Sequence, residues 1–118
     1  MKSIMIIEDN EYILHANAEY LRLCDYDVTE AATIRDAWIA QDRHQAILII
    51  LDNQLPDGYG LDFCKELRRA SDIPVIMISA EGGITGEADA LKQGVNVYLR
   101  KPYAMEELQY HVERLTST

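Results

Sequence analysis

Apolar residues follow two alternating patterns along this chain. Short runs of apolar and β-branched residues, typical of strands, occur at positions 3–7, 27–30, 46–51, 74–78 and 96–99. Between these runs apolar residues recur three or four positions apart, as Leu14, Ala18 and Leu21 do, which indicates one face of a helix. The pattern therefore predicts five strands that alternate with five helices.

This alternation favours an α/β fold, in which helices cover both faces of a parallel sheet. The runs at 3–7, 46–51 and 74–78 are almost wholly apolar, as expected of strands buried on both faces. The run at 27–30 is mixed and favours an edge strand. We predict a single domain over residues 1–118, with a flavodoxin-like, doubly wound, five-stranded parallel sheet in the order 2-1-3-4-5 and five helices.

The charge and the apolar runs exclude two classes of partner. The formal net charge is −9, from 20 acidic and 11 basic residues, and such a chain is repelled by nucleic-acid phosphates. The longest apolar runs are far shorter than the roughly 20 residues that cross a membrane, and acidic residues follow the N-terminus too soon for a signal peptide. We therefore predict no direct nucleic-acid binding, no membrane contact and a cytoplasmic location.

Polar residues that suit chemistry follow four of the five predicted strands. Glu8 and Asp9 come after the first strand, Asp52 after the third, Ser79 after the fourth and Lys101 after the fifth. In a parallel sheet the carboxyl ends of the strands share one edge, and ligands bind there, at the point where the strand order reverses. Each residue alone reads as a turn, cap or loop residue. Their joint occurrence at four strand ends predicts one crevice that holds three carboxylates, a hydroxyl and an ammonium.

Three carboxylates in one crevice repel one another, so one of them holds a proton unless a cation is bound. Sites with few carboxylates and room for water suit Mg²⁺. The set therefore predicts phosphoryl transfer, with Asp52 as the nucleophile that forms an aspartyl phosphate. Mg²⁺ and Lys101 would offset the charge on the transferred group, and Ser79 would donate a hydrogen bond to it.

Four segments resemble the motifs of the response-regulator receiver domains of two-component signalling, and the resemblance covers the whole chain. The segments are IMIIEDN, LIILDNQLPDGYGLDFCKELR, IPVIMISA and GVNVYLRKPY. The resemblance implies that Asp52 is the phosphoacceptor and that Asp9 binds Mg²⁺ directly. Glu8 would order a coordinated water, and the backbone carbonyl of Gln54 would be the third protein ligand.

The resemblance also implies how such a site would switch. Lys101 pairs with the phosphoryl group, Ser79 moves toward it and Tyr98 swings inward. The bond between Lys101 and Pro102 is cis in this family. The remaining residues that flank the site would tune the lifetime of the phosphate, and these are Asn53, Gln54 and Glu81.

The partners that follow from the resemblance are a sensor histidine kinase and an output domain. The chain would be a phosphoacceptor signalling domain and not an enzyme. It would belong either to a DNA-binding transcriptional regulator of the winged-helix class or to a stand-alone receiver. Phosphorylation would alter the face of the fourth helix, fifth strand and fifth helix, through which a homodimer would form.

Two departures from the family pattern bear on that face. Asn96 and Val97 replace acidic residues that form dimer salt bridges in many members, and His111 and Glu113 replace in part the usual basic residues. This disfavours a salt-bridged dimer and leaves an apolar one through Val97. Glycines in the segment 81–87 predict either a mobile or shortened start to the fourth helix or ordinary loop glycines.

Three other functions are weaker. A phosphatase of the haloacid-dehalogenase type would need an acid two residues after Asp52, where Gln54 stands. A flavodoxin-like cofactor binder would need a phosphate-binding loop where the chain has Glu8, Asp9 and Asn10. A pseudo-receiver that acts by protein–protein contact alone needs none of the acidic positions that are filled here.

Overall fold

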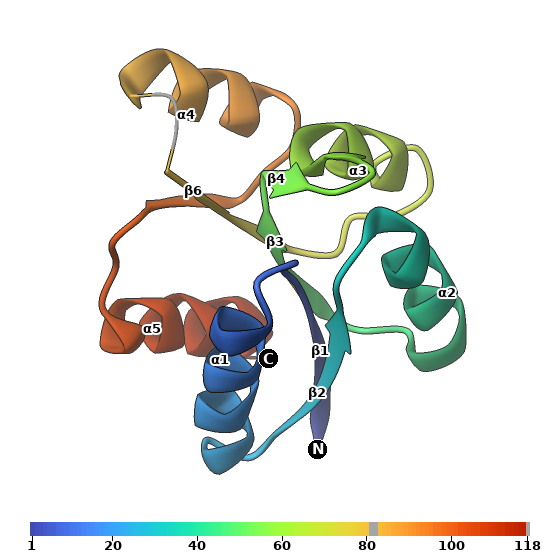
Figure 1. The fold of residues 1–118 in the computed structure, drawn as a ribbon, viewed down its shortest axis with the longest axis vertical. Helices are drawn as coiled ribbons and strands as arrows, with labels where there is room; N and C mark the ends of the chain where they lie inside the picture. Colours follow the sequence, from blue (N-terminus) through green and yellow to red (C-terminus); the bar gives the residue numbers. More distant parts are fainter. Residues whose placement is uncertain (81–82, 118) are drawn as a thin grey trace.

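The computed structural model describes residues 1–80 and 83–117 and has an α/β fold built on a five-stranded parallel sheet (Figure 1). Across the sheet the strands are β2 (Tyr26–Ala31), β1 (Lys2–Ile7), β3 (Leu48–Asp52), β6 (Val75–Ser79) and β7 (Val97–Arg100). Counted along the chain this is the order 2-1-3-4-5, so the predicted fold class is confirmed. Among the described residues, no helix has the length and apolar character to span a membrane.

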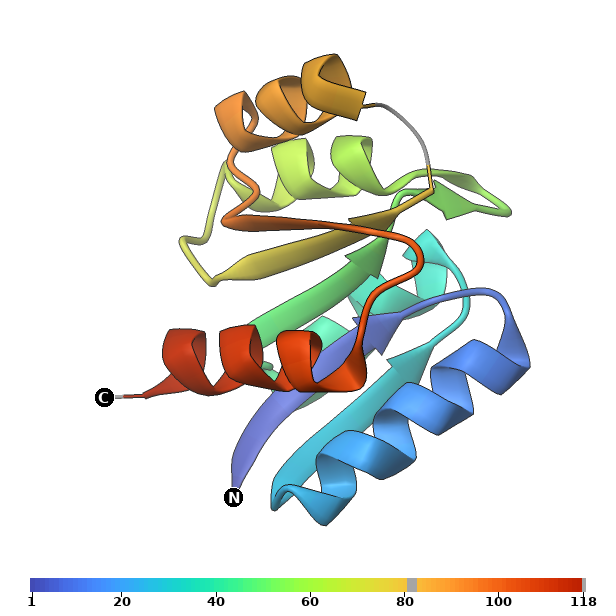
Figure 2. The same ribbon diagram turned by 90° about the vertical axis from the view of Figure 1, so that its left-hand side faces the viewer.

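The helices form a layer on each face of the sheet (Figures 1 and 2). One layer holds α1 (Glu11–Leu23) and α5 (Met105–Thr116), and the other holds α2 (Ile34–His44), α3 (Gly60–Leu67) and α4 (Gly83–Lys92). Side chains of β1 alternate between the layers: Ile4 and Ile6 pack toward α1 and α5, whereas Met5 and Ile7 pack toward the other helices. Burial on both faces explains why the run at 3–7 is continuously apolar.

A short antiparallel hairpin follows β3 and was not expected from the sequence. It consists of β4 (Gln54–Leu55) and β5 (Gly58–Tyr59). Asp57 in its turn accepts hydrogen bonds from the backbone N–H groups of Ile34 and Arg35, at 2.9 and 3.0 Å. The two bonds attach the hairpin to the first turn of α2.

Helix α2 begins at a side-chain cap. Thr33 is the N-cap of α2, and its Oγ1 accepts the backbone N–H of Asp36 at 3.0 Å. We expect Thr33→Ala to lower the free energy of unfolding by about 1 kcal/mol, because it leaves this N–H without its partner. Urea unfolding measures the change. Thr33→Ser keeps the oxygen and is the control, so an equal loss in both variants would contradict the capping role.

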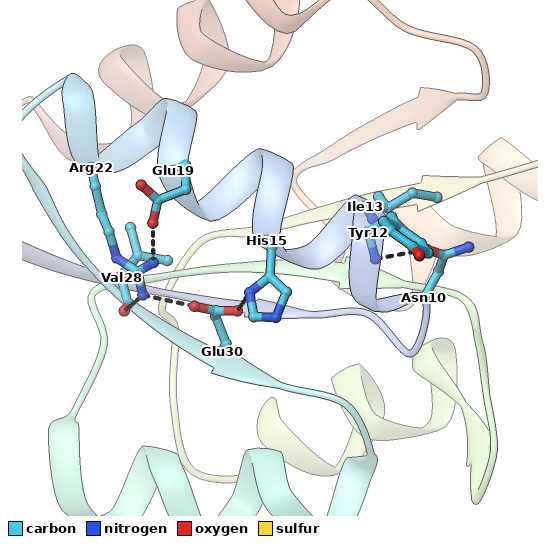
Figure 3. Close-up of polar contacts among 8 residues, drawn as sticks. All are labelled: Asn10, Tyr12, Ile13, His15, Glu19, Arg22, Val28 and Glu30. Carbon is cyan, nitrogen blue, oxygen red and sulfur yellow. Dashed lines mark hydrogen bonds and ion pairs between the residues drawn. The ribbon is translucent and has the colours of Figure 1, made fainter.

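Helix α1 is attached firmly to the edge strand β2 (Figure 3). Arg22 Nη2 lies 2.8 Å from Glu30 Oε2 and donates to the carbonyl of Val28 at 2.9 Å. Glu30 Oε1 lies 2.7 Å from His15 Nδ1. Asn10 caps the start of the helix, since its Oδ1 accepts backbone N–H groups of the first turn at 3.0 and 3.2 Å. The helix thus begins two residues after Asp9 and is held at its start, middle and end.

The structure corrects the expectation that Val97 of β7 is available for a dimer contact. Val97 is 9% exposed and packs in the core beneath α1 and α5, so the prediction that it offers an apolar dimer contact is wrong. Asn96 Oδ1 accepts hydrogen bonds from the N–H of Val75 and from Arg68.

The glycine-rich segment 81–87 is part of a helix from its third residue onward. Helix α4 begins at Gly83, so its glycines are helical and are not loop glycines. Residues 81–82 of this segment lie outside the described residues.

Candidate functional site

The order of the strands brings the predicted residues to one edge of the sheet. Asp52 is the last residue of β3 and Ser79 the last of β6, while Glu8 and Lys101 directly follow β1 and β7. Lys101 Nζ lies 3.2 Å from Asp52 Oδ2 and 3.7 Å from Glu8 Oε1. One carboxylate oxygen from each of Glu8, Asp9 and Asp52 lies within 4.8 Å of the others.

These groups border a cleft of about 300 Å³ at the carboxyl end of the sheet. Its lining residues are Glu8, Asp9, Asn10, Ile13, Asp52, Gln54, Ser79, Ala80 and Lys101. The volume leaves room for a hydrated cation and a phosphoryl group beside the carboxylates. The floor is buried and the rim is open, because Glu8 and Asp52 are 5% and 8% exposed whereas Asp9 is exposed.

Asp52 is a buried carboxylate at the end of a buried strand, and its partners explain how it is tolerated there. Its Oδ1 accepts the backbone N–H of Gln54 at 3.2 Å, and its Oδ2 accepts a hydrogen bond from Lys101. Buried charges are stable only when they are paired in this way. The same charge, held next to an open cleft, is available to a reacting group.

The surroundings of the acidic cluster raise the pKa of one of its carboxyl groups. The pKa of Glu8 is raised from 4.5 to about 7, chiefly by burial and then by the hydrogen bond and the negative charge of Asp52. The N–H of Asn10 and the ammonium of Lys101 oppose this rise but do not cancel it. For Lys101, burial is the largest single effect and lowers the pKa, but the charge and hydrogen bond of Asp52 and the charge of Glu8 together leave the pKa raised, so the side chain is charged. A further positive charge near Glu8 would therefore be favourable.

The donor set fits Mg²⁺, the metal that the sequence predicts. Three carboxylates that converge within 4.8 Å, one of them with a pKa near 7, supply hard oxygen ligands and an unbalanced negative charge. Glu8, Asp9, Asp52 and Gln54 all line the same cleft. Their separate roles toward the metal stay predictions.

The two residues predicted to switch, Ser79 and Tyr98, have different surroundings. Ser79 is 2% exposed and lines the cleft, and its carbonyl accepts the backbone N–H of Lys101 at 3.0 Å. Tyr98 is half-buried in β7, on the side of α2, α3 and α4. The bond between Lys101 and Pro102 is cis, as predicted. Glu81, which was expected to flank the site, lies outside the described residues.

Sequence reasoning did not predict how Asn53 and Gly60 hold the turn that follows Asp52. A Cβ at Gly60 would lie 2.4 Å from the carbonyl oxygen of Asp52, so only glycine allows α3 to begin this close to β3. Asn53 fixes the same turn, because its carbonyl accepts the N–H of Gly60 at 2.7 Å and its side chain that of Leu61 at 3.1 Å. The Asn53 side chain is thus occupied in the turn. A glycine eight residues after Asp52 was visible in the sequence, but its close contact was not.

Comparison with known proteins gives a family match over most of the chain. The model of the response regulator receiver domain matches residues 4–113. The KDP operon transcriptional regulatory protein KdpE of Escherichia coli is 36% identical over 109 residues, which are 92% of this chain and 48% of that protein. The probable transcriptional regulator ycf27 of Cyanophora paradoxa is 33% identical over 116 residues, 97% of this chain and 48% of that protein. The chain thus spans about half the length of these curated relatives.

Solved structures agree with this match. The non-phosphorylated HemR receiver domain from Leptospira biflexa superposes with a TM-score of 0.91 and is 27% identical. The aligned region covers 100% of this chain and 96% of that one. The likeness therefore extends over the whole length of the chain.

Proposed function

Because the chain belongs to the response regulator receiver domain family of two-component systems, we propose that it accepts a phosphoryl group on Asp52 with Mg²⁺ bound beside it. The observation that carries the proposal is the placement of Asp52, whose carboxylate is 3.2 Å from the ammonium of Lys101 and is grouped with Glu8 and Asp9. A carboxylate nucleophile must be ionised and must face a cleft that a phosphoryl donor can enter, and Asp52 lines such a cleft.

The proposed step is a displacement at phosphorus. A carboxylate oxygen of Asp52 forms a bond to the phosphorus of a phosphohistidine or acyl phosphate, and the bond to the donor breaks with its electron pair leaving on the donor. Lys101 offsets the negative charge of the transferred oxygens, and the hydroxyl of Ser79 donates a hydrogen bond to one of them. Bound Mg²⁺ would supply further positive charge for those oxygens. Asp9 and Asp52 would hold it directly, with the carbonyl of Gln54, and Glu8 through water.

The proposed output follows from the new charge. A phosphoryl group adds roughly −1.5 to −2 charges and three strong acceptors, which draw Ser79 and Lys101 toward Asp52. Tyr98 then moves inward, and the face formed by α4, β7 and α5 changes. Arg100 of β7 lies 3.2 Å from Glu87 of α4, an ion pair that any shift of α4 would alter. The change is a shift between two populations of packing.

The partners belong to the same proposal. A sensor histidine kinase would donate the phosphoryl group, and the altered face would control an output or pair with a second copy of the chain. Relatives named as transcriptional regulators support transcription as that output. A winged-helix DNA-binding domain is the output domain that we propose for it. A stand-alone receiver or a phosphate-independent pseudo-receiver is the alternative.

Phosphoryl uptake is tested by incubating the chain with acetyl phosphate and recording its intact mass with Mg²⁺ and with EDTA. We expect a gain of one phosphoryl group that requires Mg²⁺, and peptide mapping should locate it on Asp52. A folded protein that gains no mass and also binds no beryllofluoride, a stable mimic of the phosphoryl group, would contradict the proposal and support the pseudo-receiver. Binding of beryllofluoride without mass gain would instead indicate rapid hydrolysis.

A further inference from the structure

A buried amide on α1 lies against the loop that carries Lys101. Asn17 is 5% exposed and shares the buried face of α1 with Leu14, Ala18 and Leu21. Its Nδ2 donates a hydrogen bond to the hydroxyl of Tyr103 at 2.9 Å. An amide on such an apolar face is costly unless it is bonded, so the pairing with Tyr103 accounts for its presence.

Tyr103 is bonded to α1 and lies near enough to the acidic cleft for the charges of the cleft to act on its hydroxyl. Burial raises the pKa of its hydroxyl, the bond from Asn17 lowers it, and the charges of Lys101, Glu8 and Asp52 also act on it. Lys101 borders both the acidic cleft and a second, largely apolar groove of about 410 Å³ to which Asn17 and Tyr103 contribute. The hydroxyl therefore lies next to the segment that presents the ammonium to Asp52.

We propose that Asn17 and Tyr103 are positioning residues that hold the backbone around Lys101 so that its ammonium stays within reach of Asp52 and the incoming phosphoryl group. This inference rests on the proposed function. On one side of the segment the N–H of Lys101 is fixed to the carbonyl of Ser79 at 3.0 Å, and on the other side Tyr103 is fixed to α1. Neither residue touches the transferred group, so both act through Lys101.

Helix α1 is a suitable anchor for this purpose. It is fixed to β2 through Arg22 and Glu30, and it begins directly after the acidic loop that holds Glu8 and Asp9. The hydrogen bond between Asn17 and Tyr103 therefore links the segment that carries Lys101 to the helix that follows the proposed metal ligands Glu8 and Asp9. A lysine side chain has many rotamers, and fixing its backbone reduces the misplacement that slows a transfer step.

The test is Tyr103→Phe, which removes the hydroxyl and keeps the ring in the core. We expect the rate of phosphoryl uptake from acetyl phosphate to fall about threefold to tenfold, the range that corresponds to loss of one hydrogen bond. Asn17→Ala should slow uptake to a similar extent, and the double variant no more than either single one. Tyr20→Phe is the matched control, because it removes a comparable bond from α1 to Gln109 of α5, 2.7 Å long, and should leave the rate unchanged.

A positioning role differs from a merely structural one in its dependence on Lys101. In a Lys101→Ala background, whose residual uptake is followed over long incubations, Tyr103→Phe should have no further effect. An unchanged rate in Tyr103→Phe, or an equal slowing with and without Lys101, overturns the inference while the proposed function stands. If the unmodified chain gains no phosphoryl group under any condition, the proposed function fails and this inference fails with it.

Discussion

Asp52→Asn is expected to abolish phosphoryl uptake, with a loss of more than about a thousandfold in rate. The amide has nearly the same shape as the carboxylate, so it fits the end of β3, but it has no negative charge with which to attack phosphorus. It also removes the ion pair in which Lys101 Nζ lies 3.2 Å from Asp52 Oδ2. Intact mass after incubation with acetyl phosphate and Mg²⁺ measures the loss.

The matched control is Asp62→Asn, an exposed aspartate in the first turn of α3. It changes the net charge by the same amount and should keep full uptake, so charge alone cannot explain a difference between the two variants. Retained labelling of Asp52→Asn would mean that another carboxylate, such as Asp9 at the rim of the cleft, accepts the group. The assignment of Asp52 would then be wrong.

The placement of Asp52 could be predicted because it depends on topology and not on detailed packing. In a parallel sheet every strand ends at the same edge, so residues after β1, β3, β6 and β7 must converge once the strand order is known. Asp52, Ser79 and Lys101 therefore follow from the alternation of strands and helices. Polar residues at four strand ends together predict a site, whereas each residue alone is equally typical of a turn or a helix cap.

The contacts that support the site could not be predicted, for two physical reasons. Asn17 and Tyr103 are 86 residues apart, and nothing local in either segment specifies the other. The hairpin of β4 and β5 has two residues in each strand, too few for a periodic signal. Val97 was expected to be available at the surface, but it is buried. Successive side chains of a strand point to opposite faces, so a shift of one residue in the strand decides whether a side chain is buried or exposed.

A second large effect concerns the stability of the metal-free protein. Its free energy of unfolding is expected to fall as the pH rises from about 4.5 to about 7, because the pKa of Glu8 is raised from 4.5 to about 7 in the folded state. Between these values the folded protein holds a proton that the unfolded chain has released, so raising the pH favours unfolding. The stabilisation is complete below pH 4.5 and is lost as the pH passes through 7. The expected loss is on the order of 2 kcal/mol.

Glu8→Gln should remove this part of the pH dependence, since glutamine does not titrate and leaves less negative charge beside Asp52 and Asp9. Urea unfolding in EDTA between pH 5 and pH 8 measures it, with the exposed Glu107→Gln as a control that should keep the original slope. Mg²⁺ should stabilise the unmodified chain more at pH 8 than at pH 5, because protons compete with the cation for the same carboxylates. That difference should shrink in Glu8→Gln. If the free energy of unfolding of Glu8→Gln still falls with rising pH as it does in the unmodified chain, a group other than Glu8 causes the pH dependence.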